Sequence, residues 1–217
     1  MYASFIFITV EDVSMLLLPR WLAYVFAVKQ QFSALIPMIA AVAPLALASF
    51  HTLPPSRNPK VNSTINPRIN STINPKINST LNPKINSTVN PRINSTINPR
   101  INSTINPKIN STLNPKINST LNPKINSAIN PRISPSVECF YYFNLDGELG
   151  GVLIKANEDV LVMFDGDLDW IGYAVSNSAS GYNLFDLDGK WIGYFCDNSA
   201  SNLNRFSLDG EWIGFTT

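Results

Sequence analysis

The last eighty residues carry a 21-residue unit four times without a gap, and this period constrains the fold more than any other feature. Its marker residues recur in phase as Phe143, Phe164, Phe185 and Phe206; as Leu149, Trp170, Trp191 and Trp212; and as Gly151, Gly172, Gly193 and Gly214. A fixed period of this size indicates a repeat architecture in which each unit packs on its neighbours.

Each unit has the pattern of a β-hairpin. In the third unit, residues 182–202, Asp188-Gly189 separates two alternating apolar runs, which favours a two-residue type I′ turn. With that turn, Phe185 lies opposite Ile192 and both face the core, whereas Trp191 lies on the other face. The second unit moves its glycine to position 166, so we expect a different turn there.

One hairpin is only marginally stable in water, so the four must pack on one another. A four-fold ring is the economical arrangement, because each hairpin then covers its neighbour's edge. The predicted fold is therefore an all-β head of four hairpins over residues 138–217. It follows an apolar N-terminal helix within a leader and linker, residues 1–57, and a low-complexity octapeptide stalk, residues 58–137.

The hairpin motif Phe-x-Leu-Asp-Gly-x-Trp-Ile-Gly-Tyr/Phe resembles the bacterial 4-fold beta flower domain. The resemblance covers about residues 138–217 and is closest in the third and fourth units. It implies a compact four-hairpin β fold and brings no activity with it. Choline-type cell-wall-binding repeats have a similar length, but their tandem Trp-Tyr-Tyr pattern is absent from this sequence.

Residues 58–137 are ten octads with the template Asn-Pro-[Lys/Arg]-Ile-Asn-Ser-Thr-Ile. Proline at every eighth position forbids a continuous helix, and each preceding asparagine is biased towards extended or turn conformations. Two modest apolar residues per octad offer little burial, so we expect an extended, mobile stalk. A narrow β-solenoid that stacks its isoleucines is the alternative. The repeated Asn-Ser-Thr sequon matters only in a pathway that glycosylates asparagine.

Charge separates the two repeat regions. The octads hold ten Lys or Arg and no acid, whereas residues 138–217 hold three basic and thirteen acidic residues. A basic stalk could lie on anionic lipid, a cell-wall polymer or nucleic acid. One charge per eight residues is much sparser than in nucleic-acid-binding surfaces, so we expect a solvated spacer and no nucleic-acid partner.

The leader is apolar and interrupted by charges. Residues 33–50 are eighteen uncharged residues, which is barely enough for a membrane span. The same run can be an export signal, because Ala46-Leu47-Ala48 matches the small-x-small cleavage pattern. Arg20 argues against a two-span hairpin that would leave the head in the cytoplasm. We therefore expect an exported or membrane-bound protein, with cleavage after Ala48.

The sequence offers no catalytic set, so we expect no enzyme and no cofactor. The single histidine, His51, lies in the linker, and no Ser-His-Asp or Cys-His set can be assembled. The phased residues Asp146, Asp167, Asp188 and Asp209 could ring a metal, but turns explain them better and no metal site is expected. Cys139 and Cys196 have the pattern of buried strand thiols, with one disulfide as the alternative.

Trp170, Trp191 and Trp212 are the candidate ligand-binding residues. Flat aromatic rings on one side of a rigid β ring could stack on a carbohydrate or on an apolar patch of a protein partner. The alternative is that they pack between hairpins, since large aromatic side chains usually supply burial.

Two functions remain open. The first is a non-enzymatic exported or surface binding or adhesion module that displays a small β head on a repetitive stalk. The second is a membrane-anchored or cytoplasmic structural repeat protein whose basic stalk contacts an anionic surface. Neither hypothesis identifies a ligand.

Overall fold

The computed structural model describes residues 53–217, except 179–180 and 199. The predicted N-terminal helix, the span at residues 33–50 and the cleavage site lie outside this part of the chain. No helix within the described residues is long and apolar enough to cross a membrane.

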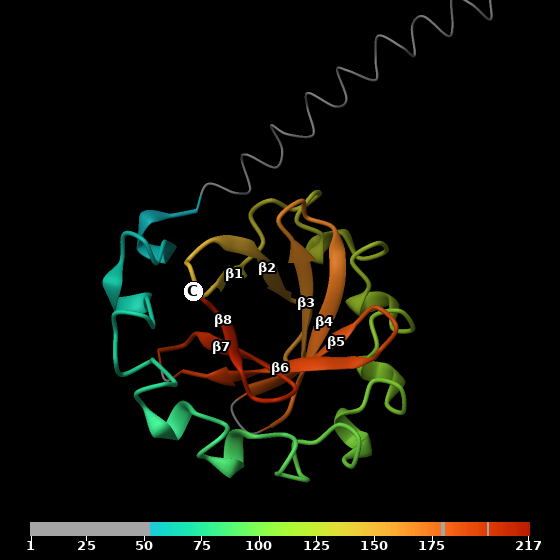
Figure 1. Ribbon diagram of the computed structural model, residues 1–217. Coiled ribbons are helices and arrows are strands. Elements are labelled where there is room, and N and C mark those ends of the chain that lie inside the picture. Colours follow the sequence, from blue (N-terminus) through green and yellow to red (C-terminus); the bar gives the residue numbers. More distant parts are fainter. Residues whose placement is uncertain (1–52, 179–180, 199) are drawn as a thin grey trace, which may run out of the picture. The chain divides into compact units, whose positions relative to one another are not determined.

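Eight antiparallel strands form a closed barrel, in which each strand pairs with the next and β8 pairs with β1 (Figure 1). This confirms the all-β class predicted for residues 138–217. The strands are β1 (Cys139–Asn144), β2 (Leu149–Lys155), β3 (Val160–Asp165), β4 (Trp170–Ser176), β5 (Gly181–Asp186), β6 (Trp191–Asp197), β7 (Leu203–Ser207) and β8 (Trp212–Thr216).

The turn between β5 and β6 is not the predicted type I′ turn. Gly189 N–H donates to Asp186 O over 3.0 Å, and Asp186 N–H donates to Lys190 O over 3.0 Å. Gly189 has a φ of +69°, whereas Asp188 has no positive φ. The loop therefore has three residues, a type I turn that ends in a left-handed residue. The Asp186 carboxylate stabilises it by accepting the N–H groups of Asp188 and Lys190.

The second hairpin makes the same turn, so the expectation of a different one was wrong. Leu168 N–H donates to Asp165 O over 3.1 Å, and Asp165 N–H donates to Asp169 O over 3.0 Å. Leu168 takes the left-handed position, with a φ of +59°. Its side chain is buried, and this burial offsets a conformational cost of about 1–2 kcal/mol.

A β-bulge beside each phased phenylalanine changes which face the tryptophans occupy. Phe185 pairs with Trp191 and Leu184 pairs with Gly193, so Ile192 is the extra residue. Because directly opposed residues share a face of the sheet, Trp191 lies on the face of Phe185 and not on the opposite one. Ile192, predicted in the core, is 38% exposed. The same shift occurs in the other three hairpins, at Phe143, Phe164 and Phe206.

The phased glycines allow one hairpin to approach the next. A Cβ on Gly193 would lie 2.6 Å from the carbonyl oxygen of Phe206, much closer than van der Waals contact. The other three glycines approach a carbonyl oxygen in the same way: Gly151 that of Phe164, Gly172 that of Phe185, and Gly214 that of Phe143. The last of these contacts joins β8 to β1, so glycine is required at the junctions that close the barrel.

Apolar side chains of the barrel form two separate clusters. The interior cluster comprises Leu153, Leu161, Met163, Ala174, Leu184, Phe195 and Leu203. It fills the barrel, as expected for eight strands. The outer cluster contains the phased phenylalanines and stacked aromatic pairs such as Tyr173–Phe185 and Tyr194–Phe206, with ring centroids 5.6 and 5.5 Å apart. The outer face of the barrel is therefore as apolar as its interior.

Residues 58–137 do not form the extended stalk that we expected. They form successive turns that follow one another around the barrel, and we call this segment the collar (Figure 1). It contains seven of the eight short 3₁₀ helices in the described chain, after the first at Pro55–Arg57: Ser63–Ile65, Ser79–Leu81, Ser87–Val89, Ser103–Ile105, Ser111–Leu113, Ser119–Leu121 and Ser127–Ile129.

Asparagine side chains hold these turns. Asn102 Oδ1 accepts the backbone N–H and the hydroxyl of Thr104, at 3.1 and 2.7 Å. Asn106 Oδ1 accepts the N–H of Lys108 at 2.9 Å, and each octad repeats this arrangement with its own residues. Asparagine side chains that hydrogen-bond the backbone two residues later favour turns over extended chain.

The last residue of each octad supplies the burial that the octads alone lack. Ile105, Leu113, Leu121 and Ile129 belong to the outer cluster of the barrel. Ordering of the collar therefore depends on an apolar surface that lies in a different part of the sequence.

We predict that Gly193→Ala destabilises the barrel by roughly 1–3 kcal/mol, because its new Cβ would collide with the Phe206 carbonyl. Gly166→Ala is the matched control: a Cβ there has no neighbour within 4 Å, so its effect should stay within about 0.5 kcal/mol. Equilibrium unfolding in urea measures both. Equal free energies of unfolding for the two variants would contradict the close approach.

Candidate functional site

Basic residues of the collar face the acidic turns of the barrel. Five ion pairs join them: Arg68–Asp146, Lys84–Glu211, Arg92–Asp209, Lys116–Asp188 and Arg132–Asp169. Each is largely exposed, so each stabilises the fold by only about 0–1 kcal/mol. The charges predicted to form a solvated spacer therefore meet the protein's own carboxylates, and together these pairs select one position of the collar on the barrel.

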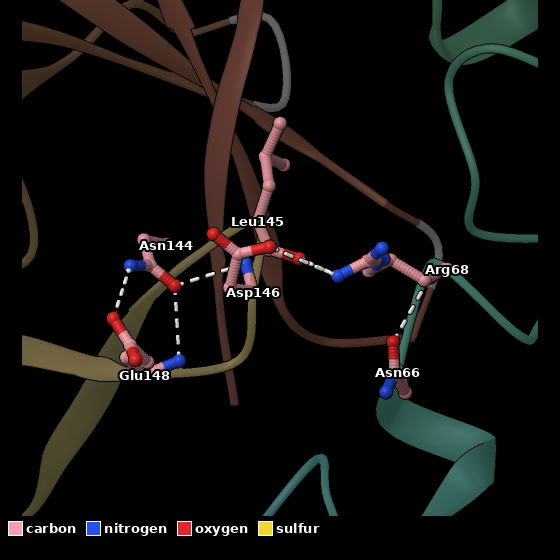
Figure 2. Close-up of polar contacts among 6 residues, drawn as sticks. All are labelled: Asn66, Arg68, Asn144, Leu145, Asp146 and Glu148. Carbon is pink, nitrogen blue, oxygen red and sulfur yellow. Dashed lines mark hydrogen bonds and ion pairs between the residues drawn. The ribbon is translucent and has the colours of Figure 1, made fainter.

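Figure 2 shows one of these contacts in detail. The Arg68 guanidinium donates to Leu145 O over 3.0 Å and to Asp146 Oδ1 over 3.2 Å. Asn144 Oδ1 accepts the N–H groups of Asp146 and Glu148, which fixes the turn that presents them. The phased aspartate thus acts as a counter-ion at a turn. Within the described part of the chain, no group of three His, Cys, Asp or Glu side chains could hold a metal ion.

Three octads of the collar correspond to one hairpin of the barrel. Asn204 Nδ2 donates to Ile73 O over 3.0 Å, and Asn183 Nδ2 donates to Ile97 O over 2.9 Å. These acceptors are 24 residues apart, whereas the donors are 21 residues apart and in the reverse order. The collar therefore passes the hairpins in the order opposite to that of the barrel.

The same offsets relate the cations that cover two of the candidate tryptophans. Lys76 Nζ lies 5.9 Å from the ring centroid of Trp212, and the Arg100 guanidinium lies 5.4 Å from that of Trp191. Both rings are almost completely buried, at 9% and 7% exposure. Trp170 is half-buried. The three rings therefore do not form one open, flat binding face.

The tryptophans differ in their hydrogen bonds. The indole N–H of Trp170 donates to Gly172 O over 2.8 Å, and that of Trp212 donates to Gly214 O over 2.9 Å. The indole N–H of Trp191 is buried and has no partner. Of the three predicted site residues, Trp191 is the one with an unused donor.

Two equivalent cavities lie between the collar and the hairpin turns. The cavity at the third hairpin has a volume of about 220 Å³, and that at the fourth hairpin about 160 Å³. The first is lined by Pro99, Arg100, Asn106, Lys108, Phe185, Gly189, Lys190 and Trp191. The second is lined by Pro75, Lys76, Asn82, Lys84, Phe206, Gly210, Glu211 and Trp212. Every residue of one cavity has its counterpart in the other.

Lys190 is the exception to the charge pattern of the turns. The equivalent residues of the other hairpins are Glu148, Asp169 and Glu211. Glu211 pairs with Lys84 and Asp169 pairs with Arg132, whereas Lys190 lines the same cavity as Lys108. The 21-residue period could have revealed this reversal of charge, but its importance depends on a collar that sequence reasoning did not place there.

Neither cysteine has the properties of a nucleophile. Cys139 and Cys196 are free, so the alternative of a disulfide is not realised. Burial raises the pKa of the Cys196 thiol to about 12, and burial also raises the pKa of Cys139. Both thiols therefore stay protonated at neutral pH and behave as small apolar side chains.

The fourth residue of every octad forms an exposed apolar row, which we call the isoleucine belt. It comprises Val61, Ile69, Ile77, Ile85, Ile93, Ile101, Ile109, Ile117, Ile125 and Ile133, with exposures of 62–69%. Its neighbours at octad positions six and seven are mostly exposed serine and threonine. The belt is therefore an uncharged apolar surface that sequence reasoning, which placed the isoleucines in a mobile stalk, did not identify.

Comparisons with family models, curated proteins and solved structures found no match. The function is therefore argued from the geometry of this chain.

Proposed function

We propose that this protein is a non-enzymatic exported or surface adhesion module, and that the isoleucine belt is its contact surface. One observation carries the proposal: all ten octads keep a β-branched apolar side chain that is at least 62% exposed. Large exposed apolar patches on soluble proteins mark interaction sites. β-branched side chains are also stiff, so they lose little conformational freedom on binding.

Variation among the octads supports a role for the belt outside the fold. The third position alternates between Lys and Arg, and the buried eighth position varies among Ile, Leu and Val. The exposed fourth position is Ile in nine octads and Val in one. The octads have therefore diverged at positions that contact the barrel, while the position that faces solvent has hardly changed.

The partner that best fits this surface is a second copy of the collar. A row of apolar side chains with an eight-residue period is matched in spacing by another row with the same period. Most of the collar's cations are directed at the barrel, so charge repulsion between two collars is small. The contact would therefore be homophilic and dominated by apolar burial.

The barrel is the scaffold in this proposal. The bulge and the close glycine contact recur every 21 residues, in support of a four-fold repeat of hairpins and of the resemblance to the 4-fold beta flower domain. Such a rigid core would hold the collar in one shape and lower the entropy cost of binding.

The alternative, a basic stalk on an anionic surface, has less support. Five of the ten octad cations pair with carboxylates of the barrel, and two more lie over tryptophan rings. Little of the basic charge is therefore available for lipid or polymer.

We predict that the intact chain self-associates and that Ile77→Thr, Ile85→Thr and Ile93→Thr together weaken association roughly tenfold or more, because apolar area is lost. Threonine keeps the β-branch, so the turns should persist. The control triple, Ser79→Ala, Ser87→Ala and Ser95→Ala, alters exposed residues of the same octads and should have no effect. Sedimentation velocity over a range of concentrations, with thermal unfolding as a check on folding, measures both. A wild-type chain that stays monomeric would contradict the proposal.

We also propose export with cleavage after Ala48, on the basis of the leader sequence. The intact mass and amino-terminal sequence of the native protein, taken separately from membrane, soluble and extracellular fractions, test this. A chain that begins at Ser49 in an exported fraction is the expected result. A full-length chain retained in the cytoplasm would contradict export.

A further inference from the structure

The cavity at the third hairpin concentrates positive charge. Arg100, Lys108 and Lys190 line it, and its lining includes no carboxylate in the part of the chain that the structure describes. The carboxylates of the same turn are engaged elsewhere. Asp186 accepts two turn N–H groups, and Asp188 pairs with Lys116 over 3.0 Å. In the equivalent cavity, Glu211 replaces Lys190 and pairs with Lys84.

An unused hydrogen-bond donor lines the same cavity. The Trp191 ring is 7% exposed and its Nε1–H has no acceptor, whereas Trp212 Nε1–H in the equivalent cavity is bonded to Gly214 O. A buried donor without a partner costs about 1–3 kcal/mol. Three cations and a free indole N–H therefore share one need, an acceptor that carries negative charge.

We propose that this cavity binds a tetrahedral oxyanion, either inorganic phosphate or the phosphate group of a small ester. The Arg100 guanidinium offers the planar fork of donors that suits phosphate oxygens, while Lys108 and Lys190 supply point charges. Trp191 supplies the fourth donor. A volume of about 220 Å³ accommodates a phosphate group with a small substituent. The site is separate from the isoleucine belt and does not depend on the adhesion proposal.

Isothermal titration of the intact chain with inorganic phosphate, in about 150 mM NaCl to screen non-specific attraction, tests the site. We expect one phosphate per chain. Lys190→Glu recreates the charge of the fourth cavity and should weaken binding roughly tenfold or more. Lys155→Glu is the matched control, because it changes the net charge equally at an exposed lysine of β2 and should leave binding unchanged.

The indole N–H resonances in NMR spectra locate the ligand. Phosphate should shift the Trp191 resonance and leave that of Trp212 in place, because Trp212 Nε1–H is already bonded. The triple isoleucine variant of the belt should bind phosphate as the wild type does, which separates this site from self-association. Absence of binding, equal weakening by Lys190→Glu and Lys155→Glu, or a shift of Trp212 alone would overturn the proposal.

Discussion

The structure depends on the packing of every eighth collar residue against the outer face of the barrel. A barrel of about eighty residues is marginal by size, and its outer face carries the phased phenylalanines that water would otherwise contact. An octad contributes one inward apolar residue, which is too little to order it alone. Each part therefore supplies the apolar surface that the other lacks, and residues 53–217 fold as one body rather than as a head on a stalk.

Charge then selects the register in which the two parts meet. Individually the exposed ion pairs are weak, but five of them repeat with a period of 24 residues in the collar and 21 in the barrel. Matching these two periods forms equivalent cavities at successive hairpins. A reversal of charge at one position, Lys190, is enough to give one cavity a different ligand preference from its counterpart.

The 21-residue period and the alternation of apolar residues were sufficient to predict an all-β region of hairpins. They were insufficient to place Trp191, because a bulge adds one residue that alternation does not signal and so moves the ring to the face of Phe185. The collar was missed for a different reason. Its order depends on a non-local surface, and octad composition alone gives no sign of it. The opposite charges of residues 58–137 and 138–217 were the available signal, and we had assigned them to external partners.

The contact between Asn183 and Ile97 tests the docking of the collar most directly, because it joins a buried barrel side chain to a collar carbonyl over 2.9 Å. NMR spectra of the intact chain should show nuclear Overhauser effects between the Asn183 side-chain amide and protons of Ile97 and Asn98. The equivalent signals should join Asn204 to Ile73 and Asn74. Octad resonances with random-coil shifts and no such effects would contradict the collar and restore an extended stalk.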